Sequence, residues 1–441
     1  MSSVAPWLRS AVHATGGEGL EKPRIDLGFI PLTDCAPLVI AKEKGFFRKH
    51  GLEVRLFREV SWANIRDKVF AGVLDGGHML APMPIATTLG LGELKKPTIT
   101  ALSLDLNGNA ITVSQRLYRR MAELDPEAAA ERSMSVRALK KVIESDRKRG
   151  YSPLCFATVF PFSTHNYMLR YWLAAGGIDP DCDVRLVVIP PPHMVDYLKA
   201  GEIDGYCVGE PWNAQAVAQG VGRTLITDYE IWNNKPEKVL GVNREWAERH
   251  PATHRALLMA LLESAQWIDR PENRVEVAEI LAREDYVSAP ADVVKMSMTG
   301  SFHYQIDAEP APLPDFNVFF RYAATFPWRS HAVWFVTQMY RWGQLRDPID
   351  IRALAEEVYR PDLYREAAQA LGLPFPTVDY KTEGQHDQPW TLQEATEPMS
   401  LGKDRFLDGG VFDPLRPVDY LEQFALHNRQ VSLDVLAKVN P

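Results

Sequence analysis

Strand-like and helix-like hydrophobic spacings alternate along the first half of the chain, and this alternation limits the possible folds more than any other feature. Apolar residues at every second position over 25–29 predict a half-buried strand. A helix should follow, because Thr33 or Asp34 is placed to cap it and Pro37 suits a first turn, where the N–H group is unpaired anyway. Gly51 ends this helix before alternate spacing resumes in the segment LEVRLF. Strand, helix and strand in this order predict a βαβ unit.

The same alternation recurs further along the chain. The spacing predicts strands at 78–80, 98–104, 110–114, 154–160, 184–189 and 205–209, and helices at 64–74, 164–175 and 192–200. Repeated units of this kind form parallel or mixed sheets with helices on their faces. We therefore predict an α/β fold.

The length of the chain and a change in its composition predict two lobes. A chain of 441 residues exceeds one compact core, since domains average about 150 residues. Charged, helical sequence begins after Ser114, so lobe I is predicted to hold 24–114 plus 240–441 and lobe II to hold 115–239. We expect residues 1–23 to be disordered or loosely attached, and the tail beyond residue 376 to lie over lobe I.

The charge and cysteine content exclude some classes of ligand. A net charge of −8 argues against the broad basic surface that nucleic-acid binding requires, so we expect no direct contact with nucleic acid. The four cysteines form no CxxC pair and no cluster with zinc-ligand spacing in the sequence. We therefore expect neither a metal nor a cofactor.

Two features of the sequence bear on location. The segment MSSVAPWLRSAVHATGGEGLEKPR carries Arg9 and lacks the apolar run of about seven residues that a secretory signal needs. The sequence also has no run of about 18 apolar residues, so we expect no membrane span. On these grounds we expect the protein in the cytoplasm.

A cleft between two α/β lobes is the place where the sequence predicts a ligand, because open α/β sheets bind ligands at the carboxyl ends of their strands. After the strand at 154–160, a helix starts at Ser163, Thr164 and His165. The free N–H groups and the positive dipole end of a helix favour a small anion by about 0.3 to 2 kcal/mol. Lys238, just before another strand, would add a full positive charge. Taken alone, each feature is more typical of a structural role, since most helix N-termini bind their own cap and most lysines are solvated.

Two further loop residues are candidates for the same cleft. Trp62 follows the predicted cap Ser61 and offers a flat wall, although a Trp at such a position more often belongs to a core. Asn109, in the sequence NGN, offers an amide, although such an Asn more often forms a turn. Neither residue identifies a ligand by itself.

Several blocks of the sequence, in their order along the chain, resemble one protein family. They include GFIPLTDCAPLVIAKEKGFFRKHGLEV, SWANIRD, GHMLAPMPI, CVGEPWNAQAVAQGVG and LDGGVFDPLRPVDYL. Over residues 24–422 the chain resembles the nitrate-binding proteins of ABC importers and nitrate sensors, which are relatives of the cyanobacterial bicarbonate-binding protein. The resemblance implies a two-lobed, type II periplasmic-binding-protein-like fold with a central ligand cleft.

The resemblance also assigns binding roles to residues that match the motifs of the family. It implies an aromatic wall at Trp62, an amide at Asn109, where relatives commonly carry Gln, and a pocket edge at Pro191 in the PPPH turn. Lys238 matches the lysine of the nitrate binders, where bicarbonate relatives carry an acidic group with a bound cation. A fixed positive charge neutralises nitrate directly, so the implied ligand is nitrate or nitrite, held without a metal.

The helix-start loop departs from the pattern of the family. Relatives have Phe-Pro-Gly-Gly-Thr-His, whereas this chain has Phe162 and Ser163 in place of the two glycines. The larger side chains restrict a close approach of the backbone to an anion. The complete predicted set of ligand-binding residues is Trp62, Asn109, Ser163, Thr164, His165, Pro191 and Lys238.

Three classes of function compete. The first is a cytoplasmic nitrate/nitrite sensor that controls nitrate assimilation genes by sequestering and releasing a response-regulator-type antiterminator, an RNA-binding protein. The second is the substrate-binding component of an ABC nitrate/nitrite importer. The third is an enzyme, since pyrimidine synthases of thiamine biosynthesis share the broad fold, but their clustered cysteine motif is missing from the sequence. The resemblance favours the first class, a binding protein that is not an enzyme.

Overall fold

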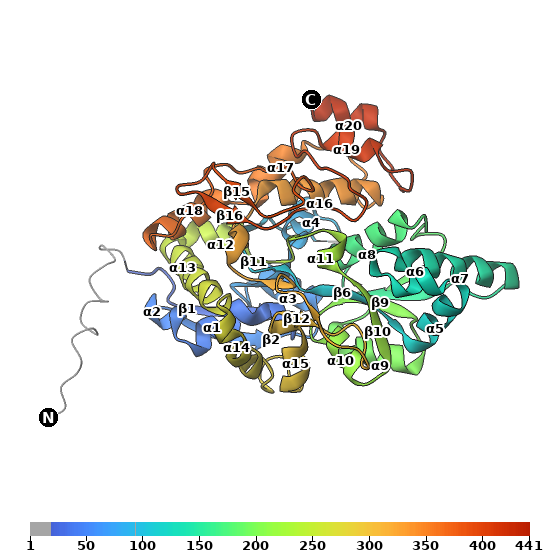
Figure 1. Ribbon diagram of the computed structural model, residues 1–441. Helices are drawn as coiled ribbons and strands as arrows, with labels where there is room; N and C mark the ends of the chain where they lie inside the picture. Colours follow the sequence, from blue (N-terminus) through green and yellow to red (C-terminus); the bar gives the residue numbers. More distant parts are fainter. Residues whose placement is uncertain (1–18, 93) are drawn as a thin grey trace.

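Two five-stranded mixed sheets form the framework of the protein (Figure 1). The computed structural model describes residues 19–441 except residue 93. The first sheet has the order β2-β1-β3-β11-β4, with β1 (Arg24–Phe29), β2 (Glu53–Arg58), β3 (Gly76–Leu80), β4 (Thr98–Ser103) and β11 (Lys238–Asn243). The second has the order β10-β6-β9-β7-β8, with β6 (Asn109–Ser114), β7 (Cys155–Thr158), β8 (Arg185–Val188), β9 (Gly205–Gly209) and β10 (Gly222–Thr227).

Each sheet combines parallel βαβ units with strands that run the other way. β1 pairs in parallel with β2 and β3, and β7 pairs in parallel with β8 and β9. β11 is antiparallel to β3 and β4, and β6 is antiparallel to β9 and β10. The reversed strands directly follow the crossings of the chain from one sheet to the other. The predicted α/β class is therefore confirmed.

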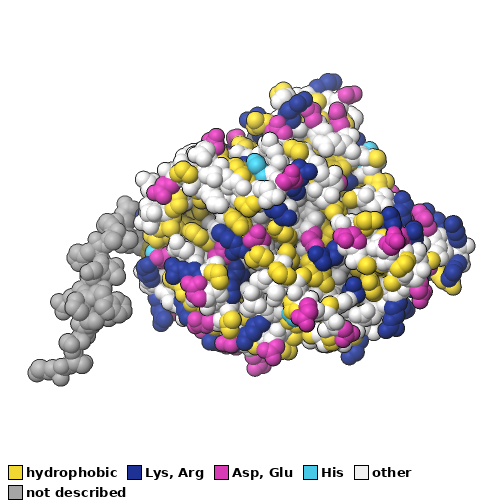
Figure 2. Space-filling view, viewed as in Figure 1, with side chains coloured by type: hydrophobic (Ala, Val, Ile, Leu, Met, Phe, Trp, Pro, Cys, Tyr) yellow, Lys and Arg dark blue, Asp and Glu magenta, His cyan; other side chains and the backbone are white. Residues whose placement is uncertain are grey.

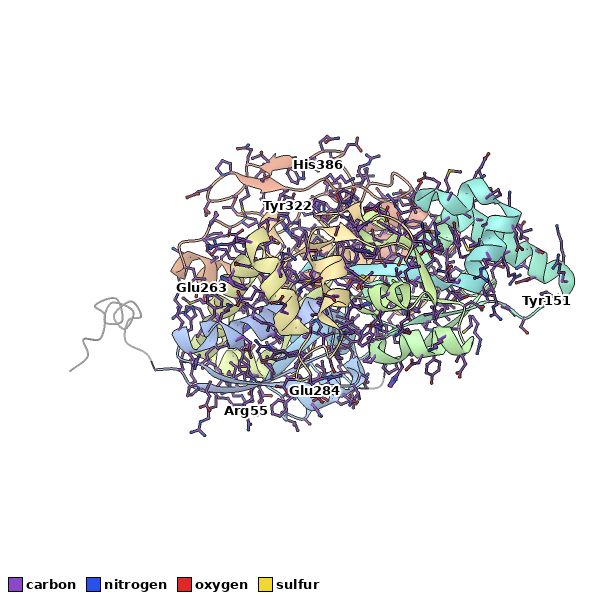
Figure 3. The ribbon with its side chains drawn as sticks, turned by 60° about the horizontal axis from the view of Figure 1, so that its bottom comes forward. Arg55, Tyr151, Glu263, Glu284, Tyr322 and His386 are labelled. Atoms are coloured by element: carbon purple, nitrogen blue, oxygen red, sulfur yellow. The ribbon has the colours of Figure 1, made fainter. Side chains whose placement is uncertain are left out.

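Helices cover both sheets, and we call each sheet with its helices a lobe. The first lobe includes α1 (Ala36–Glu43), α2 (Phe46–Lys49), α3 (Trp62–Phe70), α4 (Met83–Leu89), α12 (Arg244–Arg249), α13 (Pro251–Ile268), α14 (Arg274–Leu281) and α15 (Ala291–Met298). The second includes α5 (Gln115–Leu124), α6 (Pro126–Ala130), α7 (Ser135–Arg149), α8 (Thr164–Ala175), α9 (Met194–Ala200), α10 (Trp212–Ala218) and α11 (Asp228–Ile231). Arg55 on β2 and Tyr151 just after α7 lie toward opposite ends of the molecule (Figure 3).

The chain changes sheets earlier than the sequence predicted. β6 pairs with β9 and β10, so residues 109–114 belong to the second sheet and not to the predicted lobe I. The first crossing therefore runs through 104–108, where β5 (Leu106–Asn107) pairs with β14 (Asn317–Val318). The boundary was misplaced because hydrophobic spacing identifies a strand without identifying the strands that pair with it.

The N-terminal prediction needs correction where the structure describes the chain. Glu21 accepts hydrogen bonds from the backbone N–H groups of Ala252 and Thr253 at 2.9 Å, and Lys22 pairs with Asp75. Residues 19–23 are therefore held against α13 and β3, because these bonds anchor both side chains. The rest of the segment predicted to be loosely attached lies outside the described residues.

The C-terminal segment spans both lobes rather than the first alone (Figure 1). It contains α16 (Arg329–Arg341), α17 (Ile351–Val358), α18 (Pro361–Ala370), β15 (Trp390–Leu392), β16 (Met399–Leu401), α19 (Pro417–Glu422) and α20 (Leu433–Val439). Phe406 stacks on Tyr171 of α8 with ring centroids 5.7 Å apart, and Trp334 of α16 contacts Tyr167 at 6.5 Å. Through these aromatic contacts the C-terminal segment packs against the second lobe.

The lobes share a hydrophobic core. One cluster of buried side chains includes Trp62 and Met79 of the first lobe together with Phe156 and Tyr206 of the second. No helix among the described residues is long and apolar enough to cross a membrane. On the face seen in Figure 2, Lys and Arg side chains are interspersed with Asp and Glu.

Candidate functional site

A cluster of buried polar and charged side chains lies between the two sheets, at the crossings of the chain. Each member is at most 1% exposed to solvent. The first lobe, the second lobe and both crossings contribute to it. We call this set the interlobe cluster: Asp34, Trp62, His78, Asp105, Asn109, Thr164, His165, Asp228, Lys235, Glu237 and Lys238.

Lys238, the first residue of β11, is the most connected cation of the cluster. Its Nζ lies 2.6 Å from Asp34 Oδ2, 2.5 Å from Glu237 Oε1 and 5.5 Å from the centroid of the Trp62 ring. Burial disfavours the charge, but the two carboxylates outweigh it and raise the pKa of Lys238 above its usual range. The lysine is therefore charged and already paired.

Asp34 connects Lys238 to His78 rather than capping a helix. It lies in η2 (Thr33–Cys35), and its Oδ1 is 2.8 Å from His78 Nε2. Neither η2 nor α1 has a side-chain cap, so the predicted capping role of Thr33 or Asp34 is wrong. Burial opposes the charge of Asp34, yet Lys238 and His78 hold its pKa below the usual value. The buried carboxylate of Asp34 therefore pairs with Lys238 and His78 and does not cap a helix.

Glu237 lies between the two lysines. Its Oε1 contacts Lys238, and its Oε2 contacts Lys235 and accepts a hydrogen bond from the Thr164 hydroxyl. His165 Nε2 is 3.6 Å from Oε1. Burial works against ionisation, but Lys235 and Lys238 lower the pKa of Glu237 well below its usual range.

The second lobe completes the network through Asp228 at the start of α11. Lys235 Nζ is 3.2 Å from Asp228 Oδ2, and Asn109 Nδ2 donates to the same oxygen at 3.0 Å. Asn109 thus joins the cluster through its amide group. The hydrogen bonds of Asp228 tie β6, α11 and the second crossing together.

The helix start at α8 positions Thr164 and His165 by means of Ser163. The Ser163 hydroxyl donates to Phe160 O at 2.6 Å and accepts from Asn166 N–H at 3.0 Å, so it caps the helix as its N-cap residue. Its hydrogen bonds are therefore made within the loop. Thr164 and His165, at the first two helical positions, extend to Glu237.

Five of the seven predicted residues meet in the interlobe cluster. Ser163 supports it through the cap, as described above. Pro191 begins η4 (Pro191–His193) and is buried, but no hydrogen bond or ring contact in the described part of the chain joins it to the cluster. Its predicted place at the pocket edge stays a prediction.

Seven polar atoms of the cluster are left without a hydrogen-bond partner in the described part of the chain. Within the described residues, Trp62 Nε1, Asn109 Oδ1 and both ring nitrogens of His165 are among the atoms without such a partner, together with Asp34 Oδ1, His78 Nε2 and Asp105 Oδ2. Burial lowers the pKa of His165 to about 3, so the ring is neutral at pH 7 and donates through one nitrogen. Unpaired buried donors are costly, and a ligand with acceptor oxygens between the lobes would satisfy the N–H groups of Trp62 and His165.

The sequence did not reveal most of the acidic residues in this cluster. Asp34 was predicted as a possible helix cap, Asp228 was not singled out, and His78 lay inside a predicted strand. An ionisable side chain in a buried strand, as in GGHML, is a signal that could have identified His78. The described residues include no group of three His, Cys, Asp or Glu side chains able to hold a metal ion.

The protein has two α/β lobes, the chain crosses between them twice, and a buried polar cluster lies at the crossings. This arrangement is that of the two-lobed substrate-binding proteins. The NMT1-like family model matches residues 18–282, and the chain belongs to this family. Within it, the chain belongs with the nitrate-binding proteins related to NrtA.

Named relatives and a solved structure give the extent of this similarity. The chain is 34% identical to the nitrate/nitrite binding protein NrtA of Nostoc sp., over 96% of this chain and 90% of that protein. The crystal structure of the periplasmic nitrate-binding protein NrtA from Synechocystis PCC 6803 matches with a TM-score of 0.81 and 32% identity, covering 92% of this chain and 100% of that one.

A longer relative matches over part of its length. The chain is 42% identical, over 97% of its residues, to the nitrate import ATP-binding protein NrtC of Synechocystis sp.. It spans 60% of the length of that protein. Domains of this kind therefore also occur within a larger, ATP-binding chain.

Proposed function

We propose that the protein binds nitrate or nitrite in the interlobe cluster, by binding alone and not as an enzyme. One observation carries the proposal: Trp62 and Lys238 of the first lobe meet His165 of the second in a sealed cluster. The centroid of the Trp62 ring is 5.9 Å from that of His165, so a flat ligand beside the indole would contact both lobes. The similarity to NrtA supports nitrate or nitrite as the class of ligand.

The chemistry of the donors fits a planar, monovalent oxyanion. Nitrate and nitrite carry one negative charge spread over oxygens, which the ammonium group of Lys238 can neutralise. The unpaired N–H groups of Trp62 and His165 can each donate to an oxygen. The family resemblance implies an acidic group with a bound cation at the position of Lys238 in bicarbonate binders, so bicarbonate is the less favoured ligand.

We further propose that the protein is a cytoplasmic sensor. In this role it controls nitrate assimilation genes by sequestering a response-regulator-type antiterminator and releasing it when the anion binds. A ligand held between two lobes favours the closed clamp, and a partner that prefers the open shape is then released. The similarity to NrtC supports a cytoplasmic site of action, because an ATP-binding protein works where ATP is present.

The alternative is the substrate-binding component of an ABC nitrate/nitrite importer. The match to periplasmic NrtA over 100% of that chain favours this reading. The two roles use the same anion site and differ in the partner: a regulator in one case, a permease in the other.

Calorimetric titration of nitrate and nitrite into the purified protein tests the binding proposal. Heat and a matching rise in melting temperature are expected with either anion, and chloride at equal ionic strength serves as control. If neither anion gives heat or stabilisation, the ligand assignment fails.

A pull-down of the native protein then separates the two roles. Recovery of a response-regulator-type protein, released by added nitrate, supports the sensor. Recovery of permease subunits, or location of the native protein outside the inner membrane, supports the importer.

A further inference from the structure

The Glu237 carboxylate is surrounded by hydrogen-bond donors from several elements. Lys238 Nζ lies 2.5 Å from Oε1, and His165 Nε2 lies 3.6 Å from the same oxygen, just beyond hydrogen-bond distance. Lys235 Nζ and the Thr164 hydroxyl both contact Oε2. Lys238 and His165 are also the residues that the proposed function assigns to the incoming anion, and Thr164 belongs to the predicted set of ligand-binding residues.

A carboxylate resembles nitrate and nitrite in shape and charge. All three are planar groups whose oxygens share one negative charge around a central atom: two oxygens in a carboxylate and in nitrite, three in nitrate. Donors arranged for one such group therefore also suit another. Glu237 thus satisfies, from within the chain, the positions that a free oxyanion would occupy.

We propose that Glu237 is an internal anion: its carboxylate occupies the oxyanion position of the interlobe cluster, and nitrate or nitrite binds by displacing it. This inference rests on the proposed function and deepens it. It makes Glu237 a residue that sets the affinity and the specificity of the site.

The charge balance of the cluster supports displacement over simple addition. The two cations are already paired: Lys238 with Asp34 and Glu237, and Lys235 with Glu237 and Asp228. Burial raises the pKa of Asp105 and of Asp228 above the usual value. An added anion would leave an uncompensated buried charge, whereas exchange for the carboxylate keeps the balance.

Displacement has consequences for affinity and for selectivity. The observed affinity of the protein is reduced by the fraction of molecules in which Glu237 holds the site. A ligand must also replace both oxygens of the carboxylate, which bridge Lys235 and Lys238. A planar oxyanion can do so, and a halide with a single acceptor atom replaces one contact at most.

The first test compares Glu237→Gln with the wild-type protein in calorimetric titrations of nitrate. Loss of the competing charge should tighten nitrate binding by about tenfold or more. Glu383→Gln is the matched control, because Glu383 is also buried and contacts Lys381 and the Ser330 hydroxyl, but lies outside the interlobe cluster. Its nitrate affinity should equal that of the wild type.

A second variant keeps the test decisive if Glu237→Gln does not fold. In Glu237→Ala the carboxylate is removed and space is left, so added formate should raise the melting temperature of the variant more than that of the wild type. Chloride at the same concentration should not.

The outcomes separate the two proposals. A folded Glu237→Gln variant that binds nitrate as the wild type does, or more weakly, overturns the internal anion and leaves the proposed function intact. Stabilisation of Glu237→Ala by formate, with no nitrate or nitrite binding by any form, supports the place of the carboxylate in the oxyanion position and overturns both the proposed ligand and its displacement of Glu237. Absence of any anion effect on Glu237→Ala overturns the internal anion.

Discussion

At the scale of the residue, Lys238 shows why a buried charge constrains a binding site. It is fully buried and contacts Asp34 and Glu237. A buried ion pair adds little net stability, because desolvation opposes the attraction, but removal of one partner leaves the others uncompensated. Lys238 therefore affects both the stability of the fold and the binding of the proposed ligand.

We predict that Lys238→Met lowers the free energy of unfolding by about 3–5 kcal/mol and abolishes nitrate binding. Urea denaturation measures the first effect and calorimetry the second. Lys295→Met is the control, since Lys295 pairs with Glu279 at 2.9 Å on the surface and such pairs contribute about 1 kcal/mol or less. Unchanged nitrate affinity in Lys238→Met would remove Lys238 from the site.

Glu210, which follows β9, gives a pH-dependent prediction at the same scale. Burial raises its pKa from 4.5 to about 8, against the lowering effect of its hydrogen bond from Ala214 N–H. The folded protein thus keeps a proton that the unfolded chain loses above its pKa. This contribution to stability is complete below pH 4.5 and is lost as the pH rises to about 8.

We expect Glu210→Gln to remove this dependence, because an amide does not titrate. The wild type should lose about 2–4 kcal/mol more of its free energy of unfolding between pH 5 and pH 8.5 than the variant does. Urea denaturation at both pH values gives the comparison. Parallel losses in the two proteins would show that Glu210 is ionised in the folded state.

At the scale of the element, two corners of the chain meet across the lobes. The loop between β1 and α1 contacts the loop between β9 and α10. Thr33 N–H donates to Glu210 O at 2.8 Å, and Trp212 Nε1 donates to Pro31 O at 3.2 Å. These bonds hold the lobes together directly beside the interlobe cluster.

Trp212→Phe should weaken the closed state of the clamp, because it removes the indole donor and keeps an aromatic ring. A hydrogen bond is worth about 1 kcal/mol, so the nitrate affinity should fall by about fivefold. Trp246→Phe is the matched control, since its indole donates to Asp75 at 2.8 Å within the first lobe. Equal nitrate affinities of the two variants would contradict a role of this contact in closure.

Local sequence signals predicted the elements better than the site. The helix predicted at 164–175 and the strand at 205–209 coincide with α8 and β9, because a cap, a terminal glycine pair and apolar spacing fix them locally. Asp34 escaped prediction because its partners His78 and Lys238 lie on segments distant in sequence. Glu237 has neighbouring lysines, but its contacts with Thr164 and His165 cross between the lobes. Periodicity identifies a buried face, but it does not identify which charges share it.

At the scale of the whole molecule, binding and release of a partner must be linked. If a bound anion lowers the affinity of the protein for the regulator, then a bound regulator lowers the affinity of the protein for the anion by the same factor. A hundredfold effect corresponds to about 2.7 kcal/mol of differential binding between the two shapes. In the proposed sensor, the effects of the anion and of the regulator on each other's binding must therefore be equal in size.

We predict that a saturating amount of the regulator weakens nitrate binding by the factor by which saturating nitrate weakens regulator binding. Calorimetry of nitrate with and without the regulator gives one factor, and regulator titrations with and without nitrate give the other. Chloride at equal ionic strength controls for screening, because exposed charges at a protein interface respond to salt alone. A regulator that binds the clamp and leaves the nitrate affinity unchanged would be an unlinked partner, and the release mechanism would then be wrong even if both ligands bind.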